Sequence, residues 1–579
     1  MADISPAWPD AARPDSVPPP MRVFLLITAL SIPSIPGAAA AQSGSPAHDL
    51  LVRGGTIADG TGAPGVRADL AIADGRIAAI GEDLGAARDT IEATGRVVAP
   101  GFIDMLGHSE FRLLADGRAI SKIFQGVTTE ITGEVSSVVP VSDATKAERA
   151  AEISPWGVEI DWEDLGGYFA RLERQGSAIN LGTWVGLSTL RVWGVGWEDR
   201  PATPAEMDAM KDVLGRAMDA GAFGLSSGLI YAPGRYAATQ EIIELARVAA
   251  ERGGFYATHM RNEGARLLEA IDEAIAIGER SGAPVLIHHL KASGKSNWGK
   301  MAQAIERIET ARARGLDVMA SVYPYVASST GLDQVLPDWV TEGGTETTLA
   351  RLADPALRDS LEAELSGRSQ SGDWTLGTSA GGPSGIQIAD VVTDSLERYE
   401  GMRLDAIAAE RGQSAAAAAI DLLVADSLRT AAIYFSMSED DLALAMRQPW
   451  VMIGGDAGIR ALDGPLSTDQ PHPRAFGTFP RVLCRYSREM NLFPLEEAVR
   501  KMTSLPAERA GLADRGVLEV GRYADVVVFD GDSVCDRATF EAPKRLAVGI
   551  EHVIVNGVPV LRDGEPTGEL PGRGLRRAD

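Results

Sequence analysis

Short apolar runs alternate with amphipathic stretches through the middle of this chain, and several of the runs end on a polar residue. Two end on histidine, Phe255-Tyr-Ala-Thr-His259 and Pro284-Val-Leu-Ile-His-His289, and a third, Trp450-Val-Met-Ile-Gly-Gly-Asp456, ends on a carboxylate. Between such runs apolar residues recur three and four positions apart, as in helices, for example over 204–220 and 265–281. Strands that alternate with helices predict a parallel sheet.

Eight of the apolar runs are predicted to be strands that close into a (β/α)8 barrel, a TIM-like α/β fold. They cover 101–105, 127–132, 178–186, 223–229, 255–259, 285–289, 317–325 and 451–456. Such barrels present their chemistry at the carboxyl ends of the strands, so His259, His289 and Asp456 are expected at one mouth. The stretch of about 331–401 departs from this alternation, and we expect an insertion over the mouth.

Both ends of the folded chain have a different, β-rich pattern. Asp-Gly and Gly-Gly turns separate strand-like runs over 49–98, and similar runs recur at 524–530 and 551–561. Neither end has enough strands for a sandwich of its own, so we expect one small composite β-sandwich domain formed by both termini. The predicted boundaries are 46–99 and 512–579 for this domain and 100–511 for the barrel.

Residues 1–45 are predicted to be a leader and signal peptide that precede the fold. Residues 1–20 are Pro-rich and unpatterned, and from Met21 a short apolar stretch leads to the small-residue run Ala38–Gln42. This pattern is typical of a signal peptide cleaved near Ala41, which predicts export, most simply to a periplasm. A disordered leader on a cytoplasmic protein is the alternative.

Charge and cysteine content narrow the class of protein. The chain of 579 residues carries a formal net charge of −25, which disfavours nucleic acid and anionic lipid as partners. Beyond the leader, no segment of the sequence is expected to insert into a membrane. Neither Cys484 nor Cys535 lies in a CxxC pattern, and we expect two buried thiols. A small-molecule substrate fits this composition best, and the oligomeric state is left open.

Carboxylates on the second predicted strand and histidines on the fifth and sixth indicate a metal site. Glu130 and Glu134 share one face of their strand, and a buried carboxylate without a partner is costly, so a cation is a natural compensation. Glu130, deeper in the strand, could equally pair with an Arg or Lys, whereas Glu134 at the mouth is favoured as a ligand. Imidazole is a preferred zinc ligand, which assigns His259 and His289. His288 is expected to point to the opposite face.

From about Asp49 to its C-terminus the sequence resembles the N-acyl-D-amino-acid deacylases, or D-aminoacylases, of the amidohydrolase superfamily. The blocks that carry the resemblance are Gly221-Ala-Phe-Gly-Leu-Ser-Ser-Gly-Leu-Ile-Tyr-Ala-Pro-Gly234, Thr258-His-Met-Arg-Asn-Glu263, His289-Leu-Lys291, Asn297-Trp-Gly-Lys300, Tyr323-Pro-Tyr325, His472-Pro-Arg-Ala-Phe-Gly-Thr-Phe-Pro-Arg481 and Glu497-Ala-Val-Arg-Lys-Met-Thr-Ser-Leu-Pro-Ala507. The family fold is a metal-bearing (β/α)8 barrel with a small β domain from both termini, in agreement with the pattern above.

The resemblance also implies roles for single residues. His259 and His289 match the two histidines on the more tightly held zinc, and Asp456 matches the aspartate that serves as general base and acid. Tyr323, Ser329 and Arg474 resemble groups that hold the substrate carboxylate. Arginine suits that task because its guanidinium can donate two parallel hydrogen bonds. The implied nucleophile is a water molecule on the metal.

Two departures from the family pattern bear on the metal. The family has His-x-His after the first strand, but here Leu106 takes the first position and His108 alone remains as a ligand. The family also has a ligating cysteine near the place of Val135, where Glu134 is the nearest residue able to bind a metal. We therefore expect one tightly bound zinc, held by Glu134, His259 and His289, and a weakened second position near His108.

The predicted function is metal-dependent hydrolysis of the N-acyl amide bond of an N-acyl-D-amino acid. A dipeptidase or cyclic-amide hydrolase of the same superfamily is the first alternative, because loops decide the substrate. A catalytically impaired barrel that binds a ligand is the second, and the loss of a histidine at Leu106 motivates it.

Overall fold

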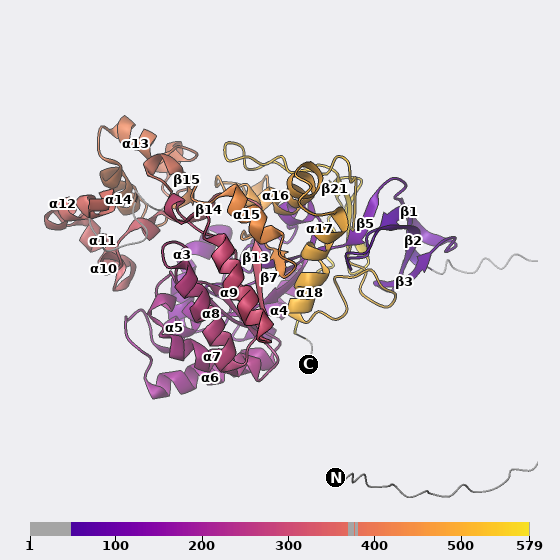
Figure 1. The fold of residues 1–579 in the computed structure, drawn as a ribbon, viewed down its shortest axis with the longest axis horizontal. Coiled ribbons are helices and arrows are strands. Elements are labelled where there is room, and N and C mark those ends of the chain that lie inside the picture. The colour runs from indigo at the N-terminus through magenta and orange to yellow at the C-terminus, as the bar shows by residue number, and fades with distance from the viewer. Residues whose placement is uncertain (1–47, 369–375, 377–379, 578–579) are drawn as a thin grey trace, which may run out of the picture. The chain divides into compact units, whose positions relative to one another are not determined.

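The computed structural model describes residues 48–368, 376 and 380–577, which fall in one compact unit (Figure 1). The predicted signal peptide, Met21–Ala41, lies outside the described residues. Among the described residues, no helix combines the length and the apolar character needed to cross a bilayer.

Parallel strands form the barrel, as predicted. Its strands are β6 (Phe102–Gly107), β7 (Val127–Thr132), β8 (Asn180–Thr183), β9 (Val185–Gly186), β10 (Gly224–Gly228), β11 (Phe255–His259), β12 (Val285–Ile287), β13 (Val318–Val322) and β17 (Val451–Ile453). Hydrogen bonds link them in the order β6-β7-β8 and β9-β10-β11-β12-β13-β17. Because β8 and β9 are successive parts of one strand and a parallel bridge from Gly107 to Ala457 joins the ends, the sheet closes. The (β/α)8 prediction is confirmed.

Helices separate the strands and cover the barrel. They are α1 (Arg112–Ala115), α2 (Ile120–Ile123), α3 (Asp143–Ile153), α4 (Leu165–Gln175), α5 (Leu187–Gly194), α6 (Pro204–Asp219), α7 (Thr239–Ala250), α8 (Leu267–Ser281), α9 (Met301–Ala313), α15 (Glu439–Met446), α16 (Arg474–Arg481), α17 (Leu495–Met502) and α18 (Ser504–Ala510). Local sequence explains where α6 begins: Thr203 and Glu206 form a capping box, and Pro204 occupies the first turn. The apolar stripe of α6 is buried, including Met210 and Leu214.

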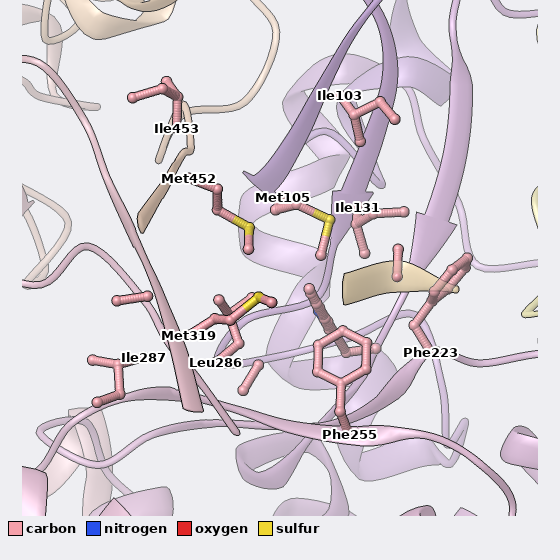
Figure 2. Close-up of a cluster of buried hydrophobic side chains, with 14 of the residues drawn as sticks. Ile103, Met105, Ile131, Phe223, Phe255, Leu286, Ile287, Met319, Met452 and Ile453 are labelled. Atoms are coloured by element: carbon pink, nitrogen blue, oxygen red, sulfur yellow. The ribbon is translucent and has the colours of Figure 1, made fainter. Parts of the chain in front are cut away.

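A single large apolar cluster holds the barrel together. Figure 2 shows side chains from most of its strands meeting there, among them Met105, Ile131, Leu286, Met319 and Met452. None of these five is more than 8% exposed. Burying one such side chain contributes about 1.5–3 kcal/mol. The scaffold under the strand ends is therefore rigid, as a catalytic site requires.

Both termini build the second domain around one nine-stranded sheet, which confirms the composite β domain. Its strands are β1 (His48–Ile57), β2 (Val66–Ala73), β3 (Arg76–Gly81), β4 (Ala87–Glu92), β5 (Val97–Pro100), β18 (Val526–Phe529), β19 (Ile550–Val555), β20 (Val558–Arg562) and β21 (Glu565–Pro566). The antiparallel pair β5–β18 joins the N-terminal strands to the C-terminal ones.

The insertion is longer than the predicted stretch of about 331–401. It comprises β14 (Ser328–Gly331), α10 (Asp338–Thr341), α11 (Gly344–Ala353), α12 (Pro355–Ala363), β15 (Ile386–Asp390), α13 (Leu404–Arg411), α14 (Ala415–Ala425) and β16 (Ala431–Tyr434). The antiparallel order β14-β16-β15 makes β16 its central strand. Residues from Leu332 to Tyr434 share one hydrophobic core, so α13, α14 and β16 belong to this unit.

The two cysteines do not remain thiols, and our prediction for them was wrong. Cys484 and Cys535 form a disulfide across 51 positions of sequence, between the helical segment after α16 and the chain that follows β18. The absence of a CxxC pattern argued against a dense disulfide scaffold, but it cannot exclude one bond between cysteines that are distant in sequence.

Removing this disulfide is expected to destabilise the protein. In the chain-entropy model a loop of this length contributes about 4 kcal/mol, because the bond restricts the unfolded chain. The Cys484→Ser/Cys535→Ser variant should therefore have a lower midpoint of thermal unfolding than the wild type under non-reducing conditions. A reductant should lower the midpoint of the wild type and leave that of the variant unchanged. Equal midpoints for both proteins without reductant would show that the bond contributes nothing.

Candidate active site

A hollow of about 390 Å³ lies at the carboxyl ends of the barrel strands. The predicted site residues line it: His108, Glu134, His259, His289, Tyr323, Ser329, Asp456 and Arg474. Ser329 belongs to the insertion, and two further residues of the insertion, Thr330 and Asp390, line the hollow as well. The insertion therefore forms part of the wall. The structure thus brings together residues that lie up to 366 positions apart, from His108 to Arg474.

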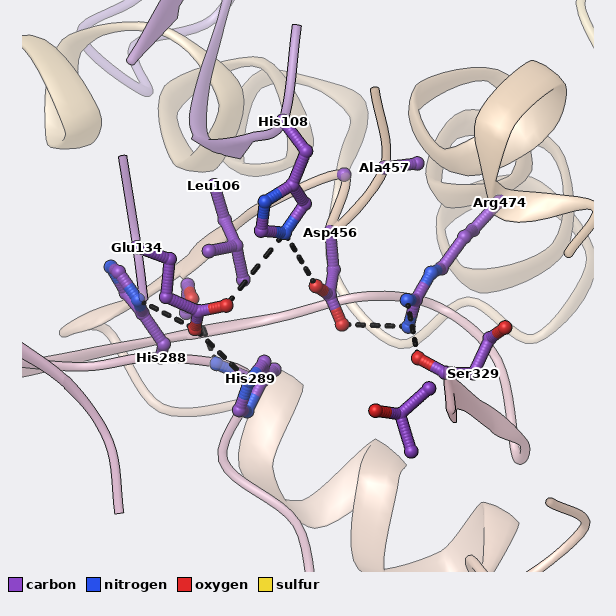
Figure 3. Close-up of polar contacts among 12 residues, drawn as sticks. Leu106, His108, Glu134, His288, His289, Ser329, Asp456, Ala457 and Arg474 are labelled. Carbon is purple, nitrogen blue, oxygen red and sulfur yellow. Dashed lines mark hydrogen bonds and ion pairs between the residues drawn. The ribbon is translucent and has the colours of Figure 1, made fainter. Parts of the chain in front are cut away.

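Glu134, His259 and His289 form a group that could hold a metal ion. One ligand atom from each lies within 4.8 Å of the others, and all three side chains are buried. The distance from His289 Nε2 to Glu134 Oε1 is 3.2 Å, and the two imidazole rings lie 4.4 Å apart, centre to centre. Figure 3 shows Glu134 and His289 facing each other.

Backbone geometry at the strand ends explains how these side chains turn into the hollow. His289 and Asp456 have φ angles of +37° and +48°, a left-handed conformation that is unfavourable for residues other than glycine. Strand β12 ends at Ile287, so strict alternation of faces no longer applies to the next two residues. His288 therefore does not point away from the site, contrary to our prediction: its Nδ1 lies 2.9 Å from Glu134 Oε1.

Two of the three side chains are in the forms that bind a metal. Burial lowers the pKa of His259 to about 4, so its imidazole is neutral at pH 7 and has a lone pair to donate. Burial alone would raise the pKa of Glu134, but His289 and His288 outweigh this effect and hold that pKa well below its usual range. A neutral imidazole and an ionised carboxylate are the forms that bind zinc. Burial and Lys291 lower the pKa of His289, but Glu263 and Glu134 outweigh them and raise that pKa to about 9, so a zinc ion would have to displace its proton.

One buried atom in this group points to a ligand. His259 Nε2 has no hydrogen-bond partner among the described residues, although the side chain is only 7% exposed. A buried polar atom without a partner is costly, and metal ligation would satisfy it. The residues present therefore fit a zinc ion, with an open position toward the hollow.

Glu263 and Lys291 lie against the two histidines. Glu263 Oε1 lies 2.9 Å from His289 Nδ1 and 2.7 Å from Lys291 Nζ, and its other oxygen lies 3.6 Å from His259 Nε2. Lys291 Nζ also lies 2.7 Å from His289 Nδ1, so Glu263 and Lys291 together hold this ring in place. These two residues lie in the sequence blocks Thr258–Glu263 and His289–Lys291, but their type and spacing alone assigned them no role.

Glu130 forms an ion pair, the alternative to metal binding that we considered for it. Its Oε2 lies 3.2 Å from Lys122 Nζ, and the side chain is fully buried beneath the hollow. Glu134 lies two residues beyond the end of β7 and is the carboxylate that reaches the histidines. The two glutamates thus have different partners.

Asp456 lies between two partners at the edge of the hollow (Figure 3). Its Oδ1 lies 3.2 Å from His108 Nε2, and its Oδ2 lies 2.6 Å from Arg474 Nη1. Burial alone would raise the pKa of Asp456, but Arg474 and His108 overcome this and hold that pKa below its usual range. The carboxylate is therefore ionised and able to accept a proton.

The residues predicted to hold the substrate carboxylate also lie together. The guanidinium of Arg474 lies 4.7 Å from the centre of the Tyr323 ring, and its Nη2 donates to the backbone oxygen of Ser329 at 3.3 Å. The guanidinium is thereby held at one end of the hollow.

A second group of possible ligands, His108, Glu134 and Asp456, shares the carboxylate of Glu134 with the first. His108 Nε2 lies 3.7 Å from Glu134 Oε2. Leu106 lies beside them in Figure 3 and offers no ligand atom. This second group therefore contains one histidine where the family pattern has two.

The closed parallel barrel and the buried Glu-His-His group at its mouth define the class of metal-dependent amidohydrolases, enzymes that hydrolyse amide bonds. The model of the Amidohydrolase family matches residues 389–561. D-aminoacylase of Alcaligenes xylosoxydans xylosoxydans is 40% identical over 538 residues, which cover 93% of this chain and 99% of that protein. The chain therefore belongs to the D-aminoacylase family.

Two further relatives support this assignment. N-acyl-D-glutamate deacylase of Alcaligenes xylosoxydans xylosoxydans is 39% identical over 535 residues, covering 91% of this chain and 96% of that protein. The crystal structure of N-acyl-D-glutamate deacylase from Bordetella bronchiseptica has a TM-score of 0.76 and 37% identity, and covers 92% of this chain and 100% of that one. That crystal structure contains zinc and a phosphonate inhibitor that mimics the tetrahedral intermediate.

Proposed function

We propose that this protein is a zinc-dependent deacylase of N-acyl-D-amino acids. The observation that carries the proposal is the buried group of Glu134, His259 and His289, with the ionised carboxylate of Asp456 across the same hollow. The names of the relatives supply the substrate class, since they act on N-acyl-D-amino acids. About one tightly bound zinc is expected, because the second ligand group shares Glu134 with the first and contains a single histidine.

The chain's own residues can perform the proton transfers of amide hydrolysis. A bound zinc ion would lower the pKa of water and polarise the scissile carbonyl. Asp456 accepts the proton of the attacking water and delivers it to the nitrogen of the departing amine, because that nitrogen must be protonated to leave. His108, 3.2 Å from Asp456, fixes the carboxylate in this position.

Arg474 and Tyr323 orient the substrate. The guanidinium of Arg474 lies between Asp456 and the inner end of β14, where it can bind the α-carboxylate of the amino acid. With the α-carboxylate and the acyl carbonyl both held, the side chains of the D and L enantiomers would extend in opposite directions. The wall of the hollow would then have to admit one of the two directions, and this would give selectivity between the configurations.

The test is a substrate panel with matched configurations. N-acetyl derivatives of D-glutamate, D-aspartate, D-leucine and D-methionine are compared with their L counterparts, with dipeptides and with a hydantoin. The proposal predicts release of the amino acid from at least one D derivative and none from its L counterpart. Preferential hydrolysis of dipeptides or of the hydantoin would instead assign the chain to another activity of its superfamily.

We also propose that the protein is exported. The pattern from Met21 to Gln42 is that of a signal peptide, and the Cys484–Cys535 disulfide suits an oxidising compartment. The mature protein should begin near residue 42, as N-terminal sequencing of protein from a periplasmic extract would show. A full-length chain recovered from the cytoplasm would contradict export.

A further inference from the structure

Three charged side chains are buried beneath the hollow without contact with it. Asp104 of β6, Lys122 of α2 and Glu130 of β7 are at most 1% exposed. Lys122 Nζ lies 2.6 Å from Asp104 Oδ2 and 3.2 Å from Glu130 Oε2. We name these residues the buried triad.

The triad is bonded to the backbone on both sides of His108. Asp104 Oδ1 accepts a hydrogen bond from Leu106 N at 3.0 Å. Glu130 Oε1 accepts one from Ser109 N, also at 3.0 Å. His108 therefore lies on a short loop whose two ends are fixed to buried carboxylates.

The same triad is bonded to the backbone on both sides of Asp456. Asp104 Oδ1 accepts from Gly455 N at 2.7 Å, and Lys122 Nζ donates to Ala457 O at 2.9 Å. Asp456 has a φ of +48°, so its backbone needs such restraint to persist. One cluster thus restrains the first and the last strand of the barrel, where they meet.

Two glycines make this close approach possible. A Cβ atom on Gly107, which precedes His108, would lie 1.9 Å from Glu130 Oε1. A Cβ on Gly455, which precedes Asp456, would lie 2.3 Å from Asp104 Oδ2. Side chains at these positions would displace the carboxylates, so the sequence around both residues is adapted to the triad.

We infer that Asp104, Lys122 and Glu130 are positioning residues that set the geometry between His108 and Asp456. The inference rests on the proposed function, since it assigns the triad to the proton-transfer step. Buried ion pairs are weak contributors to stability, and well-packed apolar residues often replace them without loss. Here the hydrogen bonds of the cluster go to backbone atoms that flank the catalytic pair. Leu106 offers no metal ligand beside Asp456. The hydrogen bonds from the triad to Gly455 N and Ala457 O therefore orient Asp456.

The test removes one positive and one negative charge together. In Asp104→Asn/Lys122→Met the net charge of the cluster is unchanged, and the asparagine oxygen can still accept from Gly455 N. The bond to Ala457 O and the central cation are lost. Because a shift of 1 Å in a catalytic group can cost about 10²-fold in rate, we expect kcat to fall by about that factor. KM and zinc content should remain as in the wild type.

The matched control is a buried ion pair away from the hollow. Arg191 and Glu241 lie 2.6 Å apart, are at most 6% exposed, and join α5 to α7. The Arg191→Met/Glu241→Gln variant should lose thermal stability to a similar extent and keep its kcat. A crystal structure of the Asp104→Asn/Lys122→Met variant should show His108 Nε2 and Asp456 Oδ1 separated beyond hydrogen-bond distance.

Two results would overturn the inference. One is an unchanged kcat and an unchanged His108–Asp456 distance in Asp104→Asn/Lys122→Met. The other is an equal loss of kcat in the control variant, which would show a general effect of destabilisation. If the first variant does not fold, Gly455→Ala gives the same test, because its methyl group displaces the Asp104 carboxylate. Lack of activity in the wild type would refute the proposed function instead, and the crystal structure would still test the triad.

Discussion

Replacing Asp456 by asparagine is expected to lower kcat by ~10²–10⁴-fold, the usual contribution of a positioned general base. Asparagine keeps the shape of the side chain and can still accept a hydrogen bond from His108, but it cannot take a proton from water. The carboxylate of Asp456 is ionised and lies 2.6 Å from Arg474, so it is present in the reactive form. Steady-state kinetics on the best N-acyl-D-amino acid would measure the loss.

Asp390 supplies the matched control for Asp456. It lies in the wall of the same hollow, at the end of β15 in the insertion, and belongs to neither of the two possible ligand groups there. Asp390→Asn should therefore leave kcat nearly unchanged. Near wild-type turnover in Asp456→Asn, with fold and zinc retained, would show that Asp456 only supports the strand end, and its catalytic assignment would have to be dropped.

Replacing Glu134 by alanine is expected to abolish zinc binding and, with it, activity. Partners that merely orient metal ligands are worth 10–100-fold in metal affinity, so loss of a ligand should cost more than ~10²-fold. Without Glu134 the two histidines would hold the ion alone, and His288 would lose its partner at 2.9 Å. Elemental analysis after gel filtration gives the zinc content of each protein.

Glu130→Ala is the natural comparison for the Glu134 variant. Glu130 pairs with Lys122 below the hollow, so its replacement should leave zinc bound and act on turnover through the buried triad. If the Glu130 variant lost its zinc while the Glu134 variant kept it, the ligand assignment on β7 would be wrong.

The barrel and the position of its mouth could be predicted from sequence, because strand ends are local features. The apolar run 255–259 is strand β11 with the same limits, and the runs that end on His289 and Asp456 predicted those residues at the mouth. The different surroundings of Glu130, paired with Lys122, and Glu134, facing His289, also followed from their depth below the mouth. The family resemblance added Tyr323, Ser329 and Arg474, which no spacing rule would have found.

Other features depend on tertiary structure that a local pattern does not encode. The contact of His288 with Glu134 depends on where β12 ends and on the left-handed backbone at His289. The pairing of Cys484 with Cys535 depends on two distant segments meeting. The triad residue Lys122 lies on the short helix α2, and the sequence around it does not distinguish a buried lysine from one on the surface.

The most direct test of the central claim is a zinc titration of the metal-free enzyme, with N-acetyl-D-amino-acid hydrolysis as the readout. We expect negligible hydrolysis without metal, a rise with added zinc that saturates at about one ion per chain, and no hydrolysis of the L counterparts. Full activity without metal, or saturation only at two equally tight ions per chain, would contradict the central claim.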